Sequence, residues 1–73
     1  MADDYQHPPS FRNQNGTFEI GTWVRFTVDH PAWDGPTTGE IRHRDSGFYI
    51  RQPFAELPIG QGFVSEDSIR LDL

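Results

Sequence analysis

The clearest pattern in the chain is the alternation of apolar and polar residues over residues 23–28. Val24, Phe26 and Val28 fall on one face of an extended segment, and Trp23, Arg25 and Thr27 fall on the other. Because successive side chains of a β-strand point to opposite faces, this spacing predicts a strand with one buried face. Shorter patterns of the same kind predict further strands over residues 38–44, 48–52, 62–65 and 69–71.

Turn-forming residues separate these predicted strands. Residues 29–37 contain two prolines and a glycine, which predicts a long irregular connection. Asp45-Ser46-Gly47 predicts a tight hairpin, with Gly47 at the left-handed position of a three-residue loop. Residues 53–62 are predicted to form a loop, because Pro58 and two glycines disfavour pairing in a sheet. The last connection, Glu66-Asp67-Ser68, has the length of one helical turn.

The first seventeen residues have a different composition from the rest. They hold acidic residues, a Pro8-Pro9 pair and a polar run, with only scattered apolar groups. Such a segment buries too little apolar surface to fold alone, which predicts a flexible N-terminal tail over residues 1–17 and a folded domain over residues 18–73. Tyr5 and Phe11 leave open the alternative that the tail is anchored to this domain.

The length and charge of the chain limit its function. Its 73 residues are enough for one domain with a single small core and leave no room for a deep substrate cleft. Eleven acidic residues against six arginines, with no lysine, give a formal net charge of −5. This charge disfavours non-specific binding to nucleic acid and favours a basic partner.

The residue types that usually carry catalysis are sparse. There is no cysteine, which excludes disulfides and thiolate chemistry, and His7, His30 and His43 are scattered over the predicted tail, loop and strand. We therefore expect neither an enzyme nor a cofactor or metal site. No secretory signal and no apolar stretch of roughly 20 residues is present, so we expect a cytoplasmic protein without a membrane partner.

The order of the predicted elements is strand, long loop, strand, tight hairpin, strand, short strand, helical turn and last strand. Over about residues 19–72 this order resembles the SH3-like barrel family in its broad sense. The resemblance implies an all-β fold, a small SH3-like five-stranded antiparallel barrel. An oligonucleotide-binding fold would need a helix between the third and fourth strands, where Pro58 makes residues 53–62 a poor candidate.

Two groups within this fold family share features with the chain. Signalling SH3 domains bind proline-rich peptides through aromatic rungs, which four residues could supply here: Trp23, Trp33, Tyr49 and Pro58. Their Ala-Leu-Tyr-Asp-Tyr segment and Trp-Trp pair are missing. Transcription and ribosome modules with a KOW motif are also similar, through Val28, Gly35 and Gly39-Glu40-Ile41, although the lysines of that motif are absent.

The whole chain also resembles a class of small bacteriophage early proteins that bind the RNA polymerase of the bacterial host. The segments Trp33-Asp34-Gly35 and Ser65-Glu66-Asp67-Ser68 carry this resemblance. It implies binding to the amino-terminal part of the largest catalytic subunit, near the RNA exit channel. Inhibition of initiation and read-through of terminators would follow, in the host cytoplasm.

Two candidate surfaces follow from these patterns. The first is a protein-binding surface of loop carboxylates and one aromatic residue: Asp29, Trp33, Asp34, Glu66 and Asp67. The second is an RNA-binding face of outward strand positions: Arg25, Arg42, Arg44, Tyr49 and Arg51. The alternatives are that Trp33 covers the core and that the arginines pair with carboxylates such as Glu40.

We expect a non-enzymatic module, monomeric when free, that attaches to bacterial RNA polymerase. Nascent RNA or an accessory transcription factor is a further possible partner. The alternative is a generic SH3-like or KOW-like module that binds single-stranded RNA or a peptide.

Overall fold

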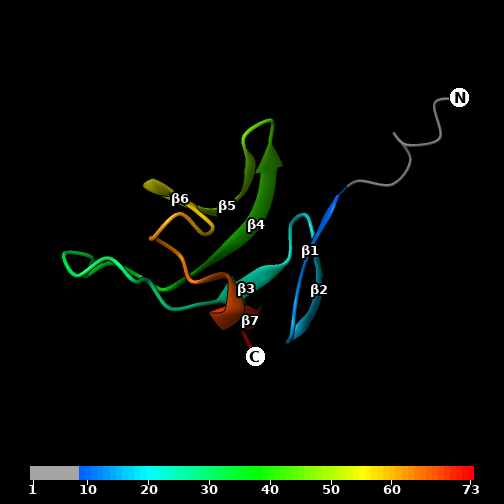
Figure 1. Ribbon diagram of the computed structural model, residues 1–73, viewed down its shortest axis with the longest axis horizontal. Coiled ribbons are helices and arrows are strands. Elements are labelled where there is room, and N and C mark those ends of the chain that lie inside the picture. Colours follow the sequence, from blue (N-terminus) through cyan, green and yellow to red (C-terminus); the bar gives the residue numbers. More distant parts are fainter. Residues whose placement is uncertain (1–8) are drawn as a thin grey trace, which may run out of the picture.

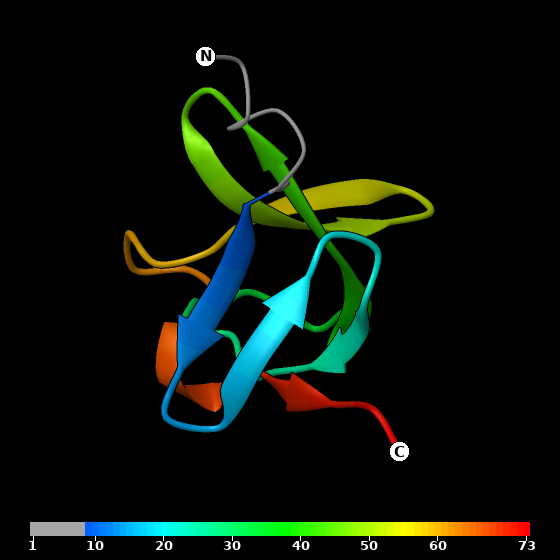
Figure 2. The same cartoon turned by 90° about the vertical axis from the view of Figure 1, so that its right-hand side faces the viewer.

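The fold is built from two antiparallel β-sheets, seen in a computed structural model that describes residues 9–73 (Figures 1 and 2). The smaller sheet is a hairpin of β1 (Ser10–Asn13) and β2 (Gly16–Glu19). The larger sheet has the strand order β6-β5-β4-β3-β7. Its strands are β3 (Trp23–Arg25), β4 (Thr38–Arg44), β5 (Gly47–Gln52), β6 (Ala55–Pro58) and β7 (Arg70–Leu71). The predicted all-β class is confirmed, but this sheet is open, with β6 and β7 at its edges, and does not close into a barrel.

The alternation over residues 23–28 has the predicted consequence. Val24 and Phe26 are buried, whereas Trp23, Arg25 and Thr27 are exposed. Regular pairing of β3 with β4 ends at Arg25, and Val28 makes only an isolated bridge to Val64. Residues 29–37 then form the irregular connection that the two prolines predict, which extends to one side of the sheet in Figure 1.

The hairpin of β4 and β5 follows the sequence pattern closely. Ile41 pairs with Ile50, and both side chains are fully buried. Arg44 pairs with Gly47, so the turn is the two residues Asp45 and Ser46 rather than a three-residue loop. Gly47 has a φ of +126°, which explains why a residue without a Cβ stands there.

A second glycine is required by packing rather than by its backbone angle. Gly39 lies buried in β4, and a Cβ at this position would collide with the Ile50 side chain and come within 2.9 Å of the Arg51 carbonyl oxygen. The glycine therefore allows β4 and the side chains of β5 to approach closely.

The prediction of a loop over residues 53–62 was wrong in its middle. Ala55–Pro58 forms β6, which pairs with β5 across a turn at Pro53 and Phe54, and Leu57 is buried opposite Ile50. Pro58 is compatible with this strand because β6 lies at the sheet edge. The strand predicted over residues 62–65 is also wrong: Val64, fully buried, makes only isolated bridges, to Val28, Ile59 and Gly60.

The chain is folded from Ser10, so the prediction of a flexible tail was wrong for residues 10–17. Phe11 of β1 pairs with Phe18 of β2, and both are buried. The Phe11 ring also meets Phe48 of the larger sheet edge-on, with ring centroids 5.6 Å apart. Figure 2 shows this hairpin lying against the larger sheet. Residues 1–8, including Tyr5, lie outside the described residues.

Two asparagines of the β1–β2 hairpin hold the helical turn that follows Ser65. This turn is the 3-10 helix η2 (Glu66–Ser68), as the sequence predicts. The Asn13 side-chain amide donates to the Glu66 and Ile69 carbonyl oxygens, at 2.6 and 3.0 Å. Asn15 donates to the Asp67 and Ile69 carbonyl oxygens, at 3.1 and 3.0 Å. The hairpin thus fixes the position of η2 while Ile69 enters the core.

Candidate functional site

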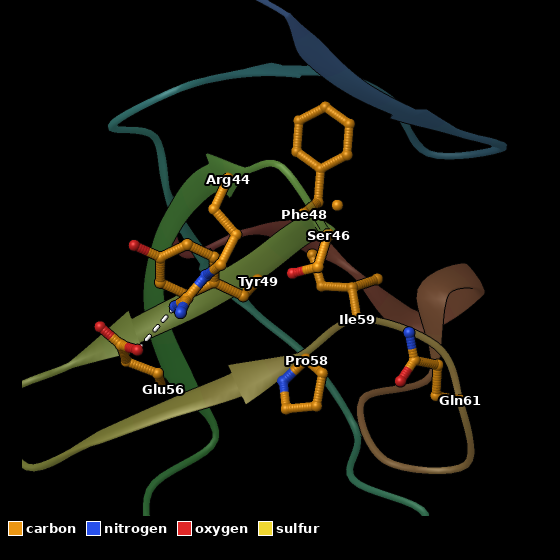
Figure 3. A pocket seen from close by; sticks show the side chains of 9 residues that line it. Arg44, Ser46, Phe48, Tyr49, Glu56, Pro58, Ile59 and Gln61 are labelled. Atoms are coloured by element: carbon orange, nitrogen blue, oxygen red, sulfur yellow. Dashed lines mark hydrogen bonds and ion pairs between the residues drawn. The ribbon is translucent and has the colours of Figure 1, made fainter.

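A pocket of about 260 Å³ opens on the outer side of the larger sheet (Figure 3). Tyr49, Pro58 and Ile59 supply apolar surface, and Arg44 and Glu56 supply opposite charges. The side chains come from three neighbouring strands and from the turns that follow them. Gln61, in the turn after β6, has the only positive φ of a non-glycine residue in the described chain, +59°.

Arg44 lies across the aromatic ring of Tyr49 in this pocket. Its guanidinium carbon is 3.7 Å from the ring centroid, and its Nη2 donates to Glu56 Oε1 at 2.6 Å. The hydrogen bond to Glu56 raises the pKa of Arg44 above its ordinary value. Tyr49, Arg44 and Glu56 therefore form a stacked and ion-paired unit in which the face of Tyr49 is already covered by a cation.

The other predicted RNA-binding residues are also matched by carboxylates. Arg25 donates to Asp72 at 2.7 Å, and Arg42 lies 3.6 Å from Glu40. Arg51 has Glu40 and Glu56 as its cross-strand partners on the two neighbouring strands. The four arginines thus share this face with three carboxylates, those of Glu40, Glu56 and Asp72, and the face does not form the basic stripe expected for RNA.

The carboxylates of the predicted protein-binding surface have a different environment. Asp29, Asp34, Glu66 and Asp67 are exposed, and within residues 9–73 none of their carboxylate groups takes part in an ion pair or a hydrogen bond. Their negative charge therefore faces solvent without internal compensation.

Backbone hydrogen bonds bring the two acidic segments together. The Ser65 N–H donates to the Thr27 carbonyl oxygen at 2.9 Å, and the Thr27 N–H donates to Ser68 Oγ at 2.8 Å. The Asp29 N–H donates to the Phe63 carbonyl oxygen at 2.7 Å. The start of the long loop and the segment that leads into η2 therefore lie side by side.

Trp33 is not a free anchor on this surface. It is half-buried against the core, its ring meets Phe63 edge-on with centroids 5.7 Å apart, and its Nε1 donates to the Pro36 carbonyl oxygen at 3.2 Å. The ring also packs against Gly35, where a Cβ would come within 2.7 Å of it. Most contacts of Trp33 therefore agree with the alternative expectation, in which its ring covers one end of the core.

Two exposed aromatic residues lie elsewhere: Trp23, which the sequence suggested only as an aromatic rung for a peptide, and Phe54, which was not predicted as a site residue. Trp23 of β3 is 48% exposed, and Phe54, in the turn between β5 and β6, is 99% exposed. Shallow hollows of about 220 and 480 Å³ adjoin them, and Pro53 lines both. Trp23 could have been found from its outward place in the alternation, whereas Phe54 was hidden because β6 was not predicted.

The described part of the chain contains no cluster of side chains that forms a metal-binding site. No group of three or more histidine, aspartate or glutamate side chains in residues 9–73 is placed to hold a metal ion. Of the histidines, His30 accepts a hydrogen bond from the Ala32 N–H, and His43 packs on Phe48. Within the same residues, no helix has the length and apolar character needed to cross a membrane.

Comparison of the chain with protein-family models, with curated proteins and with solved structures found no match.

Proposed function

We propose that the protein is a non-enzymatic module that binds a basic surface of another protein through the carboxylates beside η2. One observation carries this proposal. Within residues 9–73, the exposed carboxylates of Asp29, Glu66 and Asp67 make no ion pair or hydrogen bond, whereas Arg25, Arg42 and Arg44 each pair with a carboxylate. A surface of this kind speeds association with a basic partner and disfavours phosphates.

The way η2 is held supports the same proposal. Four hydrogen bonds from Asn13 and Asn15 fix the backbone that carries Glu66 and Asp67. A charged surface that is ordered before binding loses less conformational entropy when the partner docks. The carboxylates of η2 are therefore better suited to a defined protein interface than those of a mobile loop.

The partner we propose is bacterial RNA polymerase, bound near the RNA exit channel of its largest catalytic subunit in the bacterial cytoplasm. Binding there would inhibit initiation and permit terminator read-through. This identification depends on the resemblance of the Trp33-Asp34-Gly35 and Ser65-Glu66-Asp67-Ser68 segments to small bacteriophage early proteins. The sheet order, with the last strand beside β3, supports an SH3-like type for the domain.

The test is a binding measurement between the full-length protein and purified, nuclease-treated bacterial core polymerase. We expect the double variant Glu66→Gln/Asp67→Asn to bind about tenfold more weakly, since interfacial charges of this kind couple to a basic partner. The matched control is Glu19→Gln/Asp45→Asn, which removes the same charge from exposed positions elsewhere.

Each outcome of this test has a different meaning. A loss specific to the η2 variant supports the proposed surface. Equal weakening by both double variants would show that only net charge matters. No binding of the unmodified protein to polymerase would refute the named partner, and binding of single-stranded RNA with a steep salt dependence would support the alternative module.

A further inference from the structure

We propose that the Tyr49–Glu56 pocket is a binding site for an arginine side chain of the protein partner, and that Arg44 covers the Tyr49 ring and the Glu56 carboxylate in the free protein. The pocket lies on β5 and β6, away from the carboxylates beside η2, and it adds a second point of recognition to the proposed function. This inference rests on the proposed function in one respect: the partner must be a basic protein.

The internal contact shows what the pocket recognises. Tyr49 offers an aromatic face, Glu56 offers a carboxylate oxygen, and Arg44 satisfies both with one planar group, 3.7 Å from the ring centroid and 2.6 Å from Glu56. A guanidinium combines a flat face that stacks on an aromatic ring with a fork of donors that fits a carboxylate, which the ammonium of lysine does not. The two side chains are thus arranged for arginine.

Arg44 is held loosely enough to be replaced. The side chains of Arg44 and Glu56 are 46% and 54% exposed, and exposed ion pairs contribute little to stability. Because Arg44 lies at the end of β4, its side chain can swing into solvent without disturbing the sheet. A partner arginine would then stack on Tyr49 and bind Glu56 in its place.

The dimensions and walls of the pocket fit a single long side chain. The open space of about 260 Å³ has Arg44 as one of its walls, and it has the size of one side chain rather than of a folded segment. Pro58 and Ile59 line it beside Tyr49 and suit the aliphatic part of an incoming arginine (Figure 3). Ser46 and Gln61 add polar groups at the rim, where the backbone of the partner would pass.

The sign of the effect of Arg44 separates this proposal from RNA binding. If Arg44 contacts phosphate, its removal weakens binding of a single-stranded oligonucleotide. If Arg44 instead covers the recognition groups, its removal uncovers the Tyr49 ring and the Glu56 carboxylate and strengthens binding of arginine.

The experiment titrates the full-length protein with an oligoarginine peptide and with an oligolysine peptide of the same length. Dissociation constants come from calorimetry, and the Arg44 and Tyr49 signals are followed by NMR. We expect the unmodified protein to prefer oligoarginine, and Arg44→Gln to tighten oligoarginine binding about two- to fivefold without a comparable change for oligolysine. Tyr49→Leu and Glu56→Gln should abolish the preference for arginine.

The matched control is Arg25→Gln. It removes the same positive charge and also frees a carboxylate, because Arg25 pairs with Asp72 at 2.7 Å. The Arg25 side chain is 45% exposed, close to the 46% of Arg44. The described structure shows no aromatic face beneath it. This control should therefore tighten both peptides equally.

Two results would overturn the proposal: equal effects of Arg44→Gln and Arg25→Gln on both peptides, or weaker oligonucleotide binding by Arg44→Gln with no change in peptide affinity. Either result leaves the polymerase assay of Glu66→Gln/Asp67→Asn unaffected, so the two proposals fail separately.

Discussion

Phe11→Ala tests whether the N-terminal hairpin belongs to the folded core. Phe11 is 7% exposed, stacks with Phe18 at a centroid distance of 6.4 Å and meets Phe48 edge-on at 5.6 Å. Removing a buried phenylalanine side chain costs about 3–5 kcal/mol, because apolar burial is lost and a cavity remains. Since Phe11 lies in a two-stranded hairpin that can partly collapse, we expect about 3 kcal/mol.

That loss is large compared with the stability of the whole protein. At roughly 0.05–0.15 kcal/mol per residue, a chain of this size is stable by only about 4–11 kcal/mol. A loss of about 3 kcal/mol should lower the melting temperature by roughly 12–24 °C. Thermal and urea unfolding, followed by circular dichroism, measure both quantities.

The control for Phe11→Ala is Arg12→Ala, the neighbouring exposed position of β1. This variant should stay within about 0.5 kcal/mol of the unmodified protein. If Phe11→Ala did the same, the hairpin would not contribute to the core, and residues 10–17 would behave as the dispensable tail that composition predicts.

Three further variants test individual contacts. Gly39→Ala should destabilise the fold by about 1–3 kcal/mol in urea unfolding, because its Cβ would collide with Ile50; unchanged stability would contradict the close approach of β4 and β5. Asn15→Asp should cost about 1–3 kcal/mol, since a carboxylate cannot donate to the Asp67 and Ile69 carbonyl oxygens, whereas Gln14→Glu, with the same added charge at an exposed position, should have little effect. Arg25→Ala should cost less than about 1 kcal/mol, and the cost should shrink as salt is added; a salt-independent loss would indicate packing by the arginine stem instead.

The elements that could be predicted are those whose pattern is local. The alternation of Val24 and Phe26, the Asp45-Ser46-Gly47 hairpin and the length of Glu66–Ser68 each depend on a few consecutive residues. The sequence does not predict the β6 strand, because Pro58 favours a loop. A proline is nevertheless tolerated in a strand at the edge of a sheet. Whether a strand lies at an edge depends on the whole sheet, and the residues of that strand alone do not reveal it.

The N-terminal hairpin was missed for a similar reason. The polar run between Phe11 and Phe18 has the composition of flexible chain, and its turn is Gln14-Asn15, since Asn13 pairs with Gly16; this is not one of the usual two-residue hairpin signals. The burial of Phe11 also involves Phe48, a distant residue of the larger sheet, which the local sequence does not reveal.

For the arginine face, the outward positions and the pairing with Glu40 could be anticipated from the sequence, but the partners Glu56 and Asp72 could not. Outward strand positions were correctly assigned to Arg25, Arg42 and Arg51, which are exposed or half-buried. Their neutralisation depends on the register that sets Glu40 and Glu56 beside Arg51, and on Asp72 from the far end of the chain. The stacking of Arg44 on Tyr49 likewise needs three strands in register.

The two edges of the larger sheet determine how this protein behaves beside other copies of itself. A strand edge with free N–H and C=O groups is a template for intermolecular pairing and aggregation. Here β7 has only two residues, and β6 ends at Pro58, which has no N–H to donate and whose carbonyl oxygen accepts from the Val64 N–H at 3.3 Å. Neither of these two edges offers a long run of free groups, so pairing of another copy along the larger sheet is disfavoured while the outer face of that sheet remains open to a partner.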